Sequence, residues 1–144
     1  MEIKVKYHDP ELKPLEFIEG EKSDWIDLRC AEEVIMKAGE SRLISLGVSI
    51  ELPAGYEAIM APRSSTFENF GIVQTNSIGV FDEIYCGDDD IWFFPAYAAR
   101  DTKISINDRI AQFRIQEHQP VPSIRTVKHL KGSKRGGFGT TGIK

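Results

Sequence analysis

The stretch SRLISLGVSIELPAGYEAIMAPRSS, residues 41–65, decides the fold class. Between residues 43 and 52 its apolar side chains alternate with small or polar ones, and this period of two is typical of a half-buried β-strand. The tetrapeptide PAGY at 53–56 then predicts a turn, because Pro and Gly give the backbone the conformations that turns require. The stretch therefore indicates β-structure interrupted by a tight turn.

Further short strands are expected on both sides of this stretch. The segment EIKVKY at 2–7 alternates in the same way, whereas PELKPLEFIEG at 10–20 carries two prolines and favours a loop or a sheet edge. Residues 64–72, SSTFENFGI, favour one short turn of helix with Ser65 or Thr66 as its cap. The remaining strand candidates are DIWFFPAYA (90–98), TKISI (102–106), RIAQFRIQE (109–117), which follows a hairpin turn at Asn107–Asp108, and SIRTVKHL (123–130).

Many short strands interrupted by Gly, Pro, Asn and Asp predict an all-β sandwich or barrel. At 144 residues, with 41% hydrophobic and 28% charged residues, the chain fits one soluble globular domain with a core of its own. The glycine-rich end KRGGFGTTGIK costs backbone entropy to order, so we expect it to be mobile. We divide the chain into a β domain, residues 1–134, and a flexible C-terminal segment, residues 135–144.

The overall charge and the cysteines narrow the range of partners. A formal net charge of -4 and a pI of about 5.4 argue against sequence-independent binding of nucleic acid, which needs a basic face. No apolar run approaches the length of a membrane span, and MEIKVKYHDP lacks the apolar core of a signal peptide. Cys30 and Cys86 have no metal-type spacing and are expected to be free thiols in a reducing cytoplasm.

Two stretches carry more functional groups than a scaffold needs. In APRSST (61–66), the Arg63 guanidinium and the neighbouring serine hydroxyls suit phosphate oxygens, and a capped turn with a surface arginine is the structural alternative. Asp82, after NSIGVF, is either a turn former or a functional carboxylate. The run of aspartates at 88–90 is expected to be a solvated hairpin tip rather than a metal site.

Two further polar residues need partners. Gln112 lies in an otherwise apolar strand candidate, so it requires either a structural partner or a ligand. Asp27, in SDWIDLR, is expected to form an ion pair with Arg29 or Arg42 if its role is structural.

Taken in chain order, these stretches resemble the five motifs of the trimeric dUTPase family, the deoxyuridine 5'-triphosphate nucleotidohydrolases, in a phage or Gram-positive-type form. The resemblance covers nearly the whole chain, and five motifs in the right order are far more specific than any one. It implies a jelly-roll-like β-barrel of the dUTPase-like β-clip type, and a homotrimer with a C-terminal lid and active sites built between subunits. It also implies hydrolysis of dUTP to dUMP and pyrophosphate with Mg²⁺. The motifs correspond to IDLR (26–29), PRSS (62–65), NSIGVFDEIY (76–85), NDRIAQF (107–113) and RGGFGTTG (135–142).

The resemblance also assigns roles to residues of the first four motifs. Asp82 matches the carboxylate that activates the attacking water, Tyr85 the ring that packs under the deoxyribose, and Asn76 the hairpin that reads uracil. Asp27 matches a carboxylate that reaches Mg²⁺ through water. Trp25 and Ser65 stand where the family commonly has glycine. Contacts to the phosphates are implied for Arg63, Ser64, Ser65 and Gln112.

In the family, the fifth motif folds over the bound nucleotide. Arg135 and the hydroxyls of Thr140 and Thr141 are thereby expected to hold the γ-phosphate. Phe138 is expected to stack on uracil, with Trp92 or Phe93 of IWFF as the alternative stacking ring. A lid that orders only on the right ligand would exclude water and complete the site.

Two other functions are compatible with parts of the sequence. A dCTP deaminase is similar in fold and carries an Arg-Ser-Ser stretch, but it needs a glutamate base, and strand alternation places the nearby Glu83 on the face opposite Asp82. A nucleotide-sensing regulatory protein would instead bind a protein partner such as a repressor. Its candidate surfaces are Trp25, the GDDD tip at 87–90 and the TFENF segment at 66–70.

Overall fold

The computed structural model describes residues 1–17, 20, 23–140 and 142–144, and its elements are almost all β-strands. The all-β prediction is confirmed. The elements are β1 (Lys4–Tyr7), β2 (Ile26–Arg29), β3 (Val34–Met36), β4 (Ser41–Ser45), β5 (Val48–Glu51), β6 (Tyr56–Pro62), α1 (Thr66–Phe70), β7 (Ile72–Gln74), β8 (Gly79–Phe81), β9 (Phe93–Ala98), β10 (Thr102–Ile104) and β11 (Arg109–Glu117).

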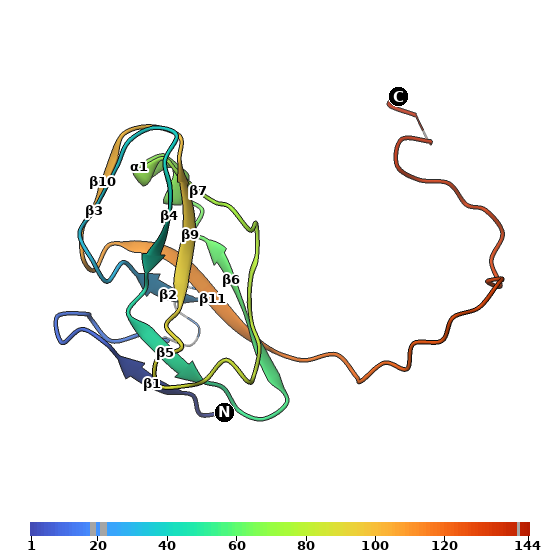
Figure 1. Cartoon of the computed structure of the whole chain (residues 1–144), viewed down its shortest axis with the longest axis horizontal. Helices are drawn as coiled ribbons and strands as arrows, with labels where there is room; N and C mark the ends of the chain where they lie inside the picture. Colours follow the sequence, from blue (N-terminus) through green and yellow to red (C-terminus); the bar gives the residue numbers. More distant parts are fainter. Residues whose placement is uncertain (18–19, 21–22, 141) are drawn as a thin grey trace.

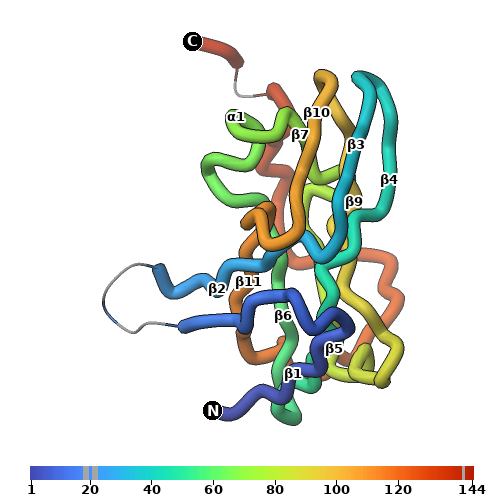
Figure 2. The backbone as a smooth tube through the Cα atoms, turned by 90° about the vertical axis from the view of Figure 1, so that its left-hand side faces the viewer, coloured from blue at the N-terminus to red at the C-terminus, as the bar shows by residue number. Residues whose placement is uncertain are grey.

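The strands form antiparallel sheets of the jelly-roll type rather than one continuous closed barrel. A four-stranded sheet has the order β2-β11-β6-β8, and a three-stranded sheet has the order β4-β9-β7. Two ribbons, β1-β5 and β3-β10, complete the described sheets. In Figures 1 and 2 the β3-β10 ribbon and α1 lie at one end of the body, and β1 and β5 lie at the other.

The central stretch from residue 41 to 52 is not one strand but two. β4 pairs with β9, whereas β5 pairs with β1, and the chain changes sheet at Gly47. Gly47 has a φ of 66°, a left-handed conformation that side chains rarely adopt. Alternation of apolar residues continues through this corner, which is why the sequence pattern alone does not reveal it.

We expect Gly47→Ala to lower the free energy of unfolding by about 2 kcal/mol or more, because a left-handed residue with a side chain costs roughly 1–2 kcal/mol and a clash adds to it. A Cβ at Gly47 would lie 2.6 Å from the Ala31 Cβ. Gly39→Ala is the matched control, since Gly39 has a φ of 89° and open space around it. Urea denaturation of both variants measures the difference. Equal losses would show that the Ala31 contact relaxes without cost.

Aromatic rings fill the core beneath the four-stranded sheet. The fully buried Trp92 stacks on Phe81 with ring centroids 3.8 Å apart and 2° between the planes. Its ring also meets Phe113 edge-on at 5.1 Å. These contacts fix the end of β8 against β11, and so they hold the segment that carries Asp82 on a rigid base.

Two predicted elements differ in detail from the structure. α1 follows Ser65 as expected, but the Ser65 side chain makes no capping bond. Instead the Thr66 hydroxyl accepts the Arg63 N–H at 2.8 Å and donates to the Ile110 carbonyl at 2.9 Å. Residues 82–85 form a turn rather than a strand, with the Tyr85 N–H donating to the Asp82 carbonyl at 3.0 Å.

The strand predicted at 123–130 is wrong. Residues 118–140 contain no helix or strand, and Figure 1 shows this segment leaving the body as an extended arm. Ile124, Val127 and Leu130 are spaced by three, so they would fall alternately on opposite faces of a strand. The loop predicted at 10–20 is confirmed for residues 10–17, which contain no strand, while residues 18 and 19 lie outside the described residues.

Both cysteines are free thiols, as the sequence predicted. Cys30 is buried, and this burial raises the pKa of its thiol to about 11, whereas Cys86 is exposed. Across the part of the chain that is described, no helix has the length and apolar character needed to cross a membrane.

Candidate functional site

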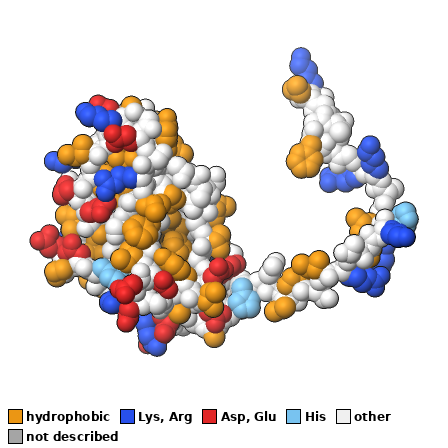
Figure 3. Space-filling model, viewed as in Figure 1, with side chains coloured by type: hydrophobic (Ala, Val, Ile, Leu, Met, Phe, Trp, Pro, Cys, Tyr) orange, Lys and Arg blue, Asp and Glu red, His pale blue; other side chains and the backbone are white. Residues whose placement is uncertain are grey.

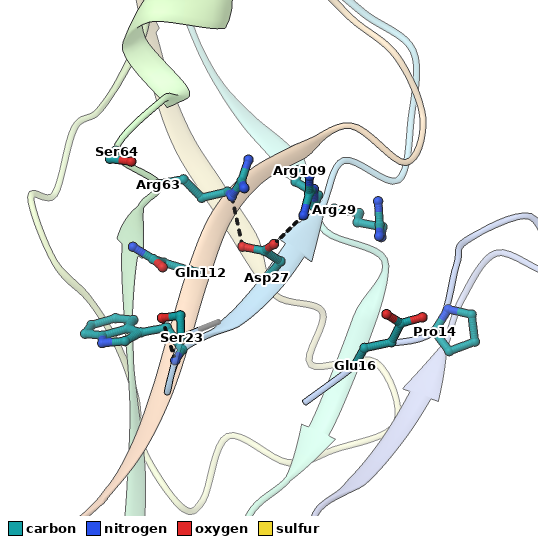
Figure 4. A pocket seen from close by; sticks show the side chains of 10 residues that line it. Pro14, Glu16, Ser23, Asp27, Arg29, Arg63, Ser64, Arg109 and Gln112 are labelled. Atoms are coloured by element: carbon teal, nitrogen blue, oxygen red, sulfur yellow. Dashed lines mark hydrogen bonds and ion pairs between the residues drawn. The ribbon is translucent and has the colours of Figure 1, made fainter. Parts of the chain in front are cut away.

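The first, second and fourth motifs meet at one cavity. It has a volume of about 360 Å³ and lies where β2, the end of β6 and the start of β11 adjoin (Figure 4). Three of its side chains are arginines and two are carboxylates, so it suits an anionic ligand. Its lining consists of Pro14, Glu16, Ser23, Trp25, Asp27, Arg29, Arg63, Ser64, Arg109 and Gln112.

Asp27 lies at the centre of this cavity, between two arginines. One carboxylate oxygen accepts the Arg63 Nε–H at 2.9 Å, and the other accepts a guanidinium N–H of Arg109 at 3.1 Å (Figure 4). All three side chains are between 24% and 44% exposed, so they remain accessible to a ligand. Each carboxylate oxygen keeps a further lone pair for a water molecule.

The predicted partners of Asp27 were wrong. Arg29 donates to the Asn107 carbonyl at 2.8 Å, and Arg42 pairs with Glu32 at 2.6 Å. Their place is taken by Arg63, which directly follows β6, and by Arg109, the first residue of β11. The pairing of β6 and β2 with β11 brings these two arginines to Asp27. Arg109 therefore belongs to the candidate site, because it lines the cavity and orients the Asp27 carboxylate through an ion pair.

Gln112 lies directly opposite Asp27 in the register of β2 and β11. Its amide group donates to the Pro62 carbonyl at 3.2 Å, which supplies the structural partner that its place in an apolar strand required. Ser64 is exposed just beyond β6, beside Arg63, while Ser65 occupies the position before α1 and does not line the cavity. The cavity therefore joins Arg63, Ser64 and Gln112 as predicted, but leaves Ser65 out.

The third motif lies elsewhere on the body. Asp82 is exposed and lines a separate cavity of about 580 Å³, together with residues at the start of β6, the end of β11 and the start of the arm. Among the described residues, the two linings have no member in common. β8 runs antiparallel to β6, with Phe81 opposite Ala58, so Asp82 lies beside the start of β6, whereas Arg63 follows its other end. One chain therefore does not bring Asp82 to Arg63.

The loop that carries Asp82 is anchored by its neighbours. The Glu83 carboxylate accepts the Gly55 N–H at 2.8 Å and lies 3.8 Å from a ring nitrogen of His118. These contacts hold the Glu83 carboxylate away from Asp82. The two residues lie in a turn, so strand alternation is not the reason for their separation. The Tyr85 hydroxyl donates to the Ile91 carbonyl at 2.8 Å, and burial raises the pKa of this phenol, with a smaller contribution from Asp90.

Asn76 occupies an exposed turn between β7 and β8. The Ile78 N–H donates to the Asn76 carbonyl at 2.6 Å, and Ser77 in the same turn has a φ of 60°. β7 and β8 belong to different sheets, so this is a tight turn between sheets and not the predicted hairpin. It presents backbone groups at its tip, which is the chemistry that reading a pyrimidine edge requires.

The fifth motif lies on the arm, away from both cavities (Figure 1). Arg135 and Thr140 are exposed, and Phe138 is fully exposed with a φ of 49°. Thr141 lies outside the described residues. Of the two alternative stacking rings, Trp92 is completely buried in the core and Phe93 is half-buried, so Phe138 is the accessible one.

Several lining residues were not anticipated as site residues. Arg29 was treated only as a partner for Asp27, and Glu16 and Ser23 belong to the segment before β2, which showed no motif. Trp25 lines the cavity and also lies 5.9 Å from the Arg114 guanidinium, so the bulky residue that replaces the common glycine has a packing role. Alternation along IDLR could have indicated Arg29, since it lies two residues from Asp27 on the same face.

The fold is shared with solved phage enzymes. The dUTPase of Staphylococcus bacteriophage 80alpha, solved with dUpNHpp, matches with a TM-score of 0.80 at 18% identity over 99% of each chain. A second structure of the 80alpha enzyme, with dUPNHPP, also matches this chain. Its description says that phage dUTPases control transfer of virulence genes by a proto-oncogenic G protein-like mechanism. A mutant dUTPase of phage phi11 of S. aureus, described with a structural Mg(II) ion, matches with a TM-score of 0.76 at 16% identity, over 90% of this chain and 98% of that one.

The sequence comparisons carry the assignment to a family. The dUTPase family model matches residues 21–142. The SPbeta prophage-derived deoxyuridine 5'-triphosphate nucleotidohydrolase of Bacillus subtilis is 54% identical over 144 residues, the full length of both chains. The chain therefore belongs to the dUTPase family. This confirms the resemblance to the family seen in the five motifs.

Proposed function

We propose that this chain hydrolyses dUTP to dUMP and pyrophosphate, which limits uracil in DNA and supplies dUMP for thymidylate synthesis. The observation that carries the proposal is the cavity in which three arginines, Ser64 and Gln112 surround Asp27. Arginine forks and hydroxyls suit the oxygens of a triphosphate. Family membership and the 54% identical nucleotidohydrolase support the same reaction.

Within this proposal the cavity binds the phosphates. Arg63 and Arg109 are held by Asp27 in defined orientations, and such prepositioned charges stabilise charge that develops in a transition state. Gln112 is fixed by the Pro62 carbonyl, and Ser64 is exposed at the cavity edge. These groups hold the triphosphate and compensate the charge of the departing pyrophosphate.

Asp82 provides the base. Its carboxylate is exposed at a cavity of its own, so it can accept a hydrogen bond from water and orient it toward the α-phosphorus. The attacking oxygen loses its proton to this carboxylate as the bond to the pyrophosphate oxygen breaks. Tyr85, anchored through its hydroxyl, offers a ring face to the deoxyribose, and the turn at Asn76 offers backbone groups to uracil.

Asp27 is the residue we propose to hold Mg²⁺, through water. Among the residues that the structure describes, no three His, Cys, Asp or Glu side chains cluster closely enough to form a cage. A single carboxylate with free lone pairs fits Mg²⁺, which keeps several waters and usually binds triphosphate oxygens. Bound there, Mg²⁺ would supply positive charge to the phosphate oxygens.

The separation of the two cavities supports a site shared between copies of the chain. Asp82 of one copy would face the arginine cavity of another, as in a homotrimer, and the segment 135–144 would close over the nucleotide as a lid. Arg135, Thr140 and Thr141 would contact the γ-phosphate, and Phe138 would stack on uracil. The enzyme would act in the cytoplasm, where its substrate is formed, without membrane or nucleic-acid partners.

A pyrophosphate-release assay across the deoxynucleoside triphosphates tests this proposal. We expect Mg²⁺-dependent turnover of dUTP and at least about a hundredfold lower kcat/KM for dCTP, because reversing a donor and an acceptor leaves buried polar groups unpaired. Equal turnover of dUTP, dTTP and dCTP would refute the substrate assignment. Ammonia release from dCTP would identify a deaminase instead.

A regulatory role is the second candidate, and the description of the 80alpha enzyme favours it. In this chain, Phe67 of α1 is 53% exposed, and Asp88 and Asp89 are exposed at the tip between β8 and β9. These would be the surfaces for a protein partner such as a repressor. A pull-down of candidate repressors with and without dUTP tests this role, and binding that is independent of Phe67 and of the tip would contradict it.

A further inference from the structure

Asn107 occupies the third position of the tight turn 105–108, which leads into β11. The Asp108 N–H donates to the Ser105 carbonyl at 3.0 Å, and Asn107 has a φ of 73°. A positive φ at this position is typical of a type II turn, which favours glycine or asparagine there. Because glycine adopts a positive φ without steric cost, what asparagine adds here beyond the backbone is its side-chain amide.

The side chain of Asn107 holds a segment that is distant in sequence. Its Oδ1 accepts the Lys13 N–H at 2.8 Å, and its Nδ2 donates to the Glu11 carbonyl at 2.9 Å. Between these two residues, Leu12 is buried in the core with 7% exposure. Residues 11–13 contain no helix or strand, so contacts such as these, rather than a β-ladder, fix their position.

The segment held by Asn107 leads directly to the arginine cavity. Pro14 and Glu16 line the cavity, and in Figure 4 they lie on the side of Arg29, away from Ser64. The Arg29 guanidinium donates to the Asn107 carbonyl at 2.8 Å. Asn107 therefore fixes both the wall that carries Glu16 and one of the arginines of the cavity.

The two carboxylates of the cavity differ in their surroundings. Asp27 forms ion pairs with Arg63 and Arg109, whereas Glu16 is exposed at the cavity wall. Like charges a few Å apart repel each other even in water, so Glu16 opposes the binding of phosphate groups. A carboxylate at this place does not help to hold a triphosphate, but it helps an anionic product to leave, and product release limits many enzymes.

We propose that Glu16 weakens the hold of the arginine cavity on pyrophosphate, and that Asn107 is the positioning residue that keeps Glu16 at the cavity. Arg29, Arg63 and Arg109 attract pyrophosphate after cleavage as they attract the triphosphate before it. Repulsion by Glu16 shortens the time for which the product blocks the site. This role rests on the proposed function, because pyrophosphate is a product of that reaction, but the binding of pyrophosphate can be measured without turnover.

Calorimetry with inorganic pyrophosphate and the full-length chain, without metal and at low ionic strength, measures the repulsion. We expect Glu16→Gln, which keeps the size of the side chain and removes its charge, to bind pyrophosphate at least about threefold more tightly than the wild type. Acidic side chains are spread over the body (Figure 3), so the control removes one of them outside the cavity lining. Glu2→Gln changes the net charge equally, and its affinity should stay within about 1.5-fold. An equal gain in both variants would overturn the role of Glu16.

Asn107→Gly tests the positioning role. Glycine fits the φ of the turn and keeps the carbonyl to which Arg29 donates, so the variant should fold and lose only the hold on residues 11–13. We expect it to bind pyrophosphate at least about twofold more tightly, because Glu16 is no longer kept at the cavity, and we expect no further gain when it is combined with Glu16→Gln. Unchanged binding, or looser binding in both backgrounds, would show that Asn107 does not act through Glu16 and would overturn its role.

A separate measurement of dUTP turnover distinguishes these roles from the proposed function. If pyrophosphate binding follows the expected pattern in a chain that does not hydrolyse dUTP, the proposed function fails and the roles of Glu16 and Asn107 stand. If the chain is active but binds pyrophosphate equally with and without Glu16→Gln, those roles are wrong and the proposed function stands. In an active chain we also expect pyrophosphate to inhibit Glu16→Gln at concentrations at least about threefold lower than for the wild type.

Discussion

Asp82→Asn is expected to reduce kcat for dUTP by roughly two to four orders of magnitude, the usual range for losing a general base. The substitution keeps the size of the side chain and most of its hydrogen bonding, but it removes the negative charge that accepts the proton of the attacking water. Because the proposed phosphate contacts come from Arg63, Ser64 and Gln112, nucleotide affinity should change little. Stopped-flow pyrophosphate release gives kcat, and calorimetry with a non-hydrolysable analogue gives the affinity.

Asp101→Asn is the control for this variant. Asp101 is an exposed aspartate in the turn between β9 and β10, where it accepts the Ala38 N–H at 2.9 Å. We expect its turnover to stay within about twofold of the wild type, as for most surface substitutions. If Asp82→Asn also turned over dUTP at the wild-type rate, Asp82 would not be the base.

A chain that ends after Lys134 is expected to fold normally and to lose at least about tenfold in turnover. The strands that build the core all precede this point, so the thermal unfolding midpoint should not change. The loss follows from Arg135, since one hydrogen bond to a charged group contributes about 1.5–3 kcal/mol, and each 1.4 kcal/mol is a factor of ten. Phe138 and the two threonine hydroxyls would add to it.

A shorter deletion distinguishes the effect of losing the fifth motif from the effect of losing the last two residues. Removing only Ile143 and Lys144 leaves RGGFGTTG intact, and this chain should keep wild-type turnover. Limited proteolysis should cut the full-length tail in the free protein and spare it in the presence of a non-hydrolysable dUTP analogue. Full activity after truncation at Lys134 would show that the tail is no lid.

The sequence predicted the strands wherever alternation was locally complete. EIKVKY, the stretch before PAGY and RIAQFRIQE all became strands, because a period of two commits a segment to one buried face. The change of sheet at Gly47 was not predicted, because the alternation of apolar and polar residues continues through it. The strand predicted at 123–130 did not form, because Ile124, Val127 and Leu130 are spaced by three and would not share one face of a strand.

The sequence motifs predicted which residues belong to the candidate site, but not how those residues are arranged. Arg63, Ser64, Gln112 and Asp27 were expected to act together, and the register of β2, β11 and β6 brings them to one cavity. The ion partners of Asp27 depend on that register, which short-range patterns do not encode. The separate location of Asp82 likewise depends on the antiparallel register of β8 against β6.

The central claim is that dUTP is hydrolysed in a site to which different copies contribute Asp82 and Arg63. Asp82→Asn and Arg63→Ala chains, each inactive alone, are unfolded, mixed in equal amounts and refolded, and turnover is measured. With random assembly around a closed ring, roughly a quarter of the sites would receive an intact residue from each side, so we expect roughly a quarter of wild-type activity. If Asp82 and Arg63 of the same chain formed the site, no intact site could arise, and a mixture as inactive as its components would contradict the account.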